Sequence, residues 1–113
     1  MNELNEFVNY LSELQIPLKK EIDIVEERIR EREKSCMSTY GCETPKYRGT
    51  LFQNNVIDNL KKLASKSNSL EELENTVRNS QIEVENKQIN YAIEVIEGFK
   101  NLDLSSNNRS NHL

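Results

Sequence analysis

One short segment carries most of the side chains that could bind a charged ligand. Two bases and a tyrosine lie between Pro45 and Gly49, just before a helix that the sequence predicts to start at Thr50. Backbone amides at a helix N-terminus point outward, and the helix dipole attracts anions there. The Arg48 guanidinium can form two hydrogen bonds to a phosphate, and a tyrosine can stack on a base. The predicted ligand- or anion-binding residues are Tyr40, Lys46, Tyr47, Arg48, Gly49 and Thr50.

The same segment has a plainer interpretation, which the sequence leaves open. Any exposed loop can carry two bases and a tyrosine, and Gly49 can serve only to shape a turn. The phosphate-binding signature G-x-x-x-x-G-K-[ST] is absent from the chain, so the segment is not a P-loop. Binding of a nucleotide or another phosphorylated small molecule at residues 46–53 is therefore a hypothesis.

Metal binding and catalysis find little support in the residue types. Cys36 and Cys42 are the only cysteines, and five residues separate them. A zinc site needs four ligands and closer cysteine pairs, and the single histidine, His112, lies in the expected C-terminal tail. We interpret both cysteines as free thiols, with a disulfide as the alternative. No nucleophile, base and orienting group recur together, so we expect no enzyme, no metal and no cofactor.

Apolar residues at helical spacing predict an all-α fold, a small bundle or extended hairpin of four to five helices with a long C-terminal helix. The first two helices are expected at residues 3–15 and 17–34, because Pro17 either ends one or opens the next. Residues 35–49 contain two glycines and a proline and predict an irregular loop.

Two capping boxes set the expected starts of the later helices. Thr50 with Gln53 predicts the start of the third helix, and Ser69 with Glu72 predicts the start of the fourth. The last pattern favours one long helix over residues 70–101, with a break near Asn79 as the alternative. A single helical domain would then span residues 1–102, followed by a disordered tail at 103–113.

The last helical pattern is apolar over an unusually wide arc. Such a stripe exceeds what one neighbouring helix covers, so one side could face the core and the other a second chain. We therefore predict a homo-oligomer or partner interface in this stretch. The predicted interface residues are Ile89, Ala92, Ile93, Val95, Ile96 and Phe99.

Charge and composition limit the partners further. The net charge is −4, which argues against broad nucleic-acid binding, and the acids of SLEELEN would face DNA phosphates if that helix entered a groove. No apolar run reaches membrane-spanning length, and the first residues, MNELNEFVNY, lack a secretory signal pattern. We expect a cytoplasmic protein without a membrane partner.

These observations favour binding over catalysis. The hypothesis is a small non-enzymatic binding protein that acts as an inhibitor, adaptor or immunity factor through protein–protein contacts. Fifteen asparagines are typical of AT-rich genomes and indicate a bacterial or phage origin. The alternative is an oligomeric protein that sequesters a nucleotide or other phosphorylated small molecule at residues 46–53.

Overall fold

The computed structural model describes the backbone of residues 3–83 and 86–111, and this part of the chain is helical with no strand. Four helices follow one another: α1 (Glu3–Lys34), α2 (Pro45–Lys66), α3 (Leu70–Glu83) and α4 (Lys87–Asn111). The predicted all-α fold of four to five helices is confirmed. The helices pack as a small bundle with an extended shape.

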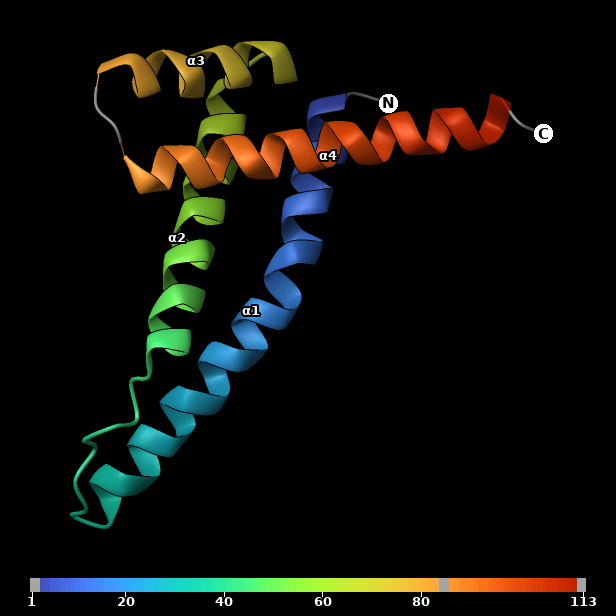
Figure 1. Ribbon diagram of the computed structural model, residues 1–113. Helices are drawn as coiled ribbons and strands as arrows, with labels where there is room; N and C mark the ends of the chain where they lie inside the picture. The colour runs from blue at the N-terminus through green and yellow to red at the C-terminus, as the bar shows by residue number, and fades with distance from the viewer. Residues whose placement is uncertain (1–2, 84–85, 112–113) are drawn as a thin grey trace.

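The molecule has two parts, a head and a projecting arm. α1 and α2 form a long antiparallel hairpin, and α3 and α4 pack across one end of it (Figure 1). We call residues 19–51 the arm and residues 3–18, 52–80 and 86–102 the head. The radius of gyration is 17.7 Å, against about 13 Å for a compact chain of 100 residues. The hairpin projects to one side of α3 and α4, and the end of α4 extends past α1, which together give the elongated shape (Figure 1).

The head contains the main hydrophobic core, to which all four helices contribute. Phe7 from α1 is fully buried, and its ring meets that of Phe99 from α4 edge-on, with 5.3 Å between the ring centroids. Ile57 from α2, Leu73 from α3 and Ile96 from α4 are also fully buried. The helical stripes predicted from spacing therefore converge on one core at this end.

The arm has a smaller apolar cluster, formed by α1 and α2 alone. Ile22, Val25 and Tyr47 are buried there, with Ile29 and Leu51 partly buried beside them. Two helices can shield only the seam between them from water. The arm therefore buries far less apolar surface than the head.

A polar contact interrupts the hairpin seam near the base of the arm. The Gln15 side-chain amide donates hydrogen bonds to Asn54 Oδ1 at 3.0 Å and to Asp58 Oδ1 at 2.7 Å. Gln15 is only 2% exposed, and its Oε1 has no hydrogen-bond partner in the structure. Because a buried polar group requires matching partners, this contact favours one register of α2 against α1.

The predicted division at Pro17 is wrong, because α1 runs unbroken through that residue. Pro17 is exposed, and so is Glu13, whose carbonyl loses its helical partner at the proline. Water can hydrogen-bond that carbonyl. The apolar stripe keeps its phase from Leu11 to Leu18 and Ile22, so a continuous helix buries all of it.

The predicted single helix over residues 70–101 is also wrong. α3 ends at Glu83 and α4 begins at Lys87, and the two lie antiparallel (Figure 1). The shift in phase of the apolar stripe is the physical reason, since a straight helix could not turn both stripes toward the hairpin. Asn86 is the signal that was missed: its Oδ1 accepts from the Gln88 amide at 2.8 Å, as an N-cap does.

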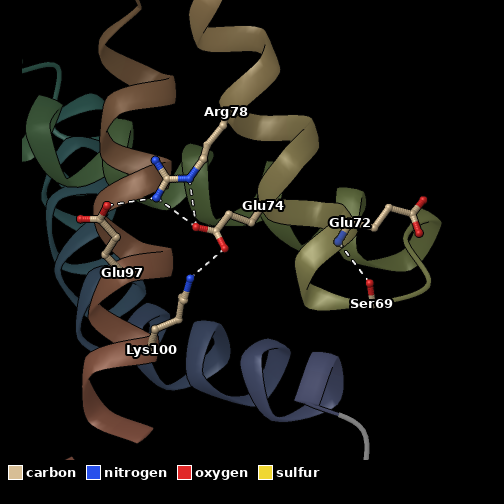
Figure 2. Close-up of polar contacts among 6 residues, drawn as sticks. All are labelled: Ser69, Glu72, Glu74, Arg78, Glu97 and Lys100. Atoms are coloured by element: carbon tan, nitrogen blue, oxygen red, sulfur yellow. Dashed lines mark hydrogen bonds and ion pairs between the residues drawn. The ribbon is translucent and has the colours of Figure 1, made fainter. Parts of the chain in front are cut away.

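The C-terminal end differs from the expectation as well. α4 continues to Asn111, so the backbone is helical through most of the stretch predicted as a disordered tail. Residues 112 and 113, which include the single histidine, lie outside the described residues. The predicted helix start at Ser69 is confirmed, since Ser69 Oγ accepts from the Glu72 amide at 3.1 Å (Figure 2). The Glu72 carboxylate accepts from the Asn68 amide at 3.1 Å and not from that of Ser69, so the reciprocal half of the predicted capping box is shifted by one residue.

Candidate functional site

The predicted ligand-binding segment lies inside α2 and not in a loop before it. α2 begins at Pro45, five residues before the predicted start at Thr50. Thr44 is the N-cap, and its Oγ1 accepts from the Tyr47 amide at 3.1 Å. The Thr-Pro pair was the missed signal, since threonine suits the N-cap and proline suits the first helical turn.

This start changes what the helix N-terminus can offer an anion. Pro45 has no amide proton, the Tyr47 amide is bound by the Thr44 side chain, and the Arg48 amide donates to the Thr44 carbonyl at 3.0 Å. Of the first four amides of α2, only that of Lys46 is left for a ligand. A backbone anion site at this terminus is therefore weak.

The predicted ligand-binding side chains separate onto different faces. Tyr47 and Thr50 are buried against α1, where the Thr50 hydroxyl lies 3.2 Å from Glu21 Oε2. Lys46 forms an ion pair with the same carboxylate at 3.3 Å, and Gly49 is exposed, with open space where a side chain would be. Burial raises the pKa of the Tyr47 phenol, and the carboxylates of Glu26 and Glu43 raise it further.

Two of the predicted residues, Tyr40 and Arg48, do come together at the far end of the arm. They line an open hollow of about 560 Å³, which we call the tip hollow. Its walls come from the end of α1, the α1–α2 loop and the first turn of α2, at the free end of the hairpin in Figure 1. The lining residues are Ile29, Glu33, Thr39, Tyr40, Gly41, Glu43 and Arg48.

The charges of the tip hollow are not paired with one another. Glu33, Glu43 and Arg48 are all exposed, and none of them takes part in an ion pair within the described part of the chain. Two carboxylates and one guanidinium thus line the same open space. Neither carboxylate was predicted as a site residue from the sequence, because only the fold of the hairpin brings α1 and the loop beside Arg48.

The loop that forms the hollow has a defined backbone. The Cys36 amide donates to the Glu33 carbonyl at 3.1 Å and the Met37 amide to the Arg32 carbonyl at 2.8 Å. With the φ of Cys36 at 56°, these bonds make the Schellman motif that commonly ends a helix. The motif usually has glycine in the position of Cys36. Cys36 is exposed and Cys42 is buried, and both are thiols.

The predicted interface residues of α4 lie mainly in the head core. Ala92, Ile93, Val95 and Ile96 are buried, while Ile89 and Phe99 are partly buried against the same cluster. α4 packs against both α3 and α2, which explains the wide apolar arc within one chain. The width of the stripe therefore no longer supports an intermolecular interface there.

A second group of charged side chains joins α3 to α4 in the head (Figure 2). Glu74 Oε1 pairs with Lys100 at 3.0 Å, Glu74 Oε2 with Arg78 at 3.0 Å, and Arg78 with Glu97 at 3.1 Å. The Lys100 ammonium, followed by Arg78, holds the pKa of Glu74 below its ordinary value. Because these charges satisfy one another, the group holds two helices together and offers little to a ligand.

Over residues 3–80 and 86–102, whose side chains the structure describes, no set of three or more histidine, cysteine, aspartate or glutamate side chains is arranged to hold a metal ion. No helix in the same ranges is long and apolar enough to cross a membrane. Comparison with protein-family models, with curated proteins and with solved structures finds no match to this chain. The function must therefore be argued from the chain's own residues.

Proposed function

We propose that this chain is a small non-enzymatic binding protein that engages another protein through the tip of its arm. It would act by occupying the partner's surface, as an inhibitor, adaptor or immunity factor of bacterial or phage origin. One observation carries the proposal: Tyr40 is 95% exposed in a loop with a defined backbone, at the end of a projecting hairpin.

The chemistry of the tip suits a protein partner. Tyrosine, methionine and arginine are enriched in the centres of protein interfaces. Tyr40 and Arg48 line the tip hollow, and Met37 is exposed in the same loop, three residues before Tyr40. A tyrosine can bury a large area on binding while losing little conformational entropy. Two apolar side chains outside the tip, Ile16 and Ile24 of α1, are also strongly exposed. Lys20 lies between them on the same face of the helix.

Specific labelling of the tip tests this proposal. A photo-crosslinking amino acid at position 40 or 37 should give one discrete protein adduct in the cells that make the chain. The control is the same group at position 16, where the native side chain is 68% exposed. An adduct shared by positions 37 and 40 and absent from 16 is the expected result. Equal labelling at all three positions, or none, would contradict the proposal.

A second candidate function is capture of a phosphorylated small molecule. Tyr40 and Arg48 share one hollow, whose volume falls within the ~300–1,000 Å³ of typical small-molecule sites. Glu33 and Glu43 oppose it, because they would repel a phosphate, and the helix amides are largely used. Native mass spectrometry should then show a co-purified mass that is absent in Arg48→Ala. The same spectra give the number of subunits, since self-association remains a prediction.

A further inference from the structure

The charge arrangement of the tip hollow indicates what kind of side chain a partner would insert. Glu33 from α1 and Glu43 from the loop line the same open space, and neither forms an ion pair among the residues that the structure describes. The other carboxylates of the arm either form ion pairs, as Glu27 does with Arg30 at 2.6 Å and Glu21 with Lys46 at 3.3 Å, or do not line the hollow. Glu33 and Glu43 are thus the unpaired carboxylates that the hollow offers to a cation from outside.

Tyr40 adds a second attraction for a cation. A cation over the face of a tyrosine ring is attracted by the negative charge of the ring's π-system. Tyr40 lines the hollow and remains almost fully exposed, so its ring is accessible to an incoming group. Two carboxylates and an aromatic ring form a suitable site for a guanidinium or an ammonium group. Ile29 of α1 also lines the hollow, and it can contact the methylene groups of such a side chain.

Arg48 has the opposite effect on the same ligand. Its guanidinium shares the hollow and forms no ion pair with any side chain that the structure describes, so it repels a second cation and lowers the net negative charge of the site. It can pair with an acidic group that flanks the inserted residue. Arg48 would therefore select among basic segments and would weaken binding of an isolated cation.

We propose that the tip hollow receives the arginine or lysine side chain of a partner protein, held by Glu33 and Glu43 beside the ring of Tyr40. This inference rests on the proposed function, because it names the chemistry of the protein partner. It also reverses the expected role of Arg48. An anionic ligand needs Arg48, whereas a cationic ligand binds better without it.

The test is a titration of ¹⁵N-labelled protein with short capped peptides at about 20 mM salt, where screening is weak. Ac-Gly-Arg-Gly-NH₂ should shift the amide signals of residues 39–43 with millimolar affinity. The citrulline peptide, which has nearly the same shape without the charge, should not. About 0.5 M salt should remove most of the shift, because exposed charges are then screened.

Matched variants decide between site binding and general charge attraction. Glu33→Gln with Glu43→Gln should weaken the arginine peptide about fivefold or more, while Arg48→Ala should strengthen it. The control, Glu6→Gln with Glu13→Gln, changes the net charge equally on exposed residues outside the hollow and should have no effect.

Three results would overturn the inference: no shift with the arginine peptide, an equal loss in the control, or weaker binding in Arg48→Ala. Inorganic phosphate shifting the same amides, with loss in Arg48→Ala, would assign the hollow to an anion. Crosslinking at position 40 without arginine binding would remove this inference and leave the proposed function standing.

Discussion

The head and the arm share two helices but are stabilised in different ways. The main core in the head contains fourteen buried apolar residues drawn from four helices, whereas the apolar cluster of the arm contains three from two helices. Fully burying a large apolar side chain contributes about 1.5–3 kcal/mol, so most of the stability must come from the head. The arm instead has its small apolar cluster, a helix cap and a loop with a defined backbone.

This difference indicates a division of roles between the two parts. Binding elements are commonly drawn from the less stable parts of a protein, because they must expose surface that a core would bury. Tyr40 and the tip hollow belong to the loop between α1 and α2 and the adjoining helix ends. That loop lies at the end of the hairpin away from α3 and α4 (Figure 1). A change in the head and a matched change in the arm should therefore affect stability to different extents.

Truncation of a core side chain should have the largest effect. Phe7→Ala in the head should lower the free energy of unfolding by about 3–5 kcal/mol, because Phe7 is fully buried and its ring contacts that of Phe99. Val25→Ala in the arm should cost about 1–2 kcal/mol. Urea denaturation followed by circular dichroism measures both. Equal losses would show that the arm is packed as tightly as the head.

Loss of the α3–α4 ion pairs should have the next largest effect. Glu74→Gln should cost about 1 kcal/mol at neutral pH, since Glu74 is 14% exposed while Lys100 and Arg78 are partly exposed. In the arm, Glu27→Gln removes an exposed pair with Arg30 and should produce no measurable change.

The same carboxylate predicts a pH dependence. The pKa of Glu74 is lowered from 4.5 in the folded state, so the unfolded chain binds its proton more readily. Its contribution to stability is therefore fully present above about pH 5 and is lost as the pH falls through the lowered folded pKa. Urea midpoints should fall more steeply with acid in the parent chain than in Glu74→Gln. Parallel curves for the two proteins would assign the acid sensitivity to other groups.

One helix cap in each part of the molecule provides a matched comparison. Thr44 caps α2 in the arm and Ser69 caps α3 in the head. Replacing either by alanine should destabilise its own helix terminus by about 1 kcal/mol. Ser69→Ala should lower the global free energy of unfolding. Thr44→Ala should mainly raise the hydrogen-exchange rate of the arm, and a full global loss in that variant would contradict the separation of the two parts.

Relief of the strained loop residue should have the smallest effect. Cys36 has a φ of 56°, a conformation that glycine adopts at little cost. Cys36→Gly should therefore stabilise the arm by roughly 0.5–1 kcal/mol, seen as slower exchange at residues 32–38. Faster exchange there would show that the side chain at position 36 holds the loop.

The fold class followed from the sequence because helical stripes depend on local spacing. The stripes around Phe7, Ile57 and Ile96 were recognisable from periodicity, and all three residues are buried. Pro17 predicted a helix boundary that does not occur, because burial of the continuous apolar stripe outweighs the loss of one exposed hydrogen bond. The turn at Asn86 was missed because one capping residue gives a weak signal against a long run of helix formers.

The candidate site was only partly predictable. Tyr40 and Arg48 were identified from their residue types, and they line one hollow. Glu33 was missed because it lies in a different helix, fifteen residues before Arg48, and only the hairpin brings the two together. The interface on α4 was predicted from the width of its apolar stripe. How much of that stripe is covered within one chain depends on how α3 folds back against α4.

Hydrogen exchange read by mass spectrometry tests the separation of head and arm most directly. Peptides from the arm, residues 22–30 and 45–51, should exchange at least about tenfold faster than peptides from the head, residues 56–64 and 92–99. That result would show that the tip is carried by a unit that opens independently of the main core. Equal protection in all four peptides would contradict the account, because the hairpin and the head would then unfold as one unit.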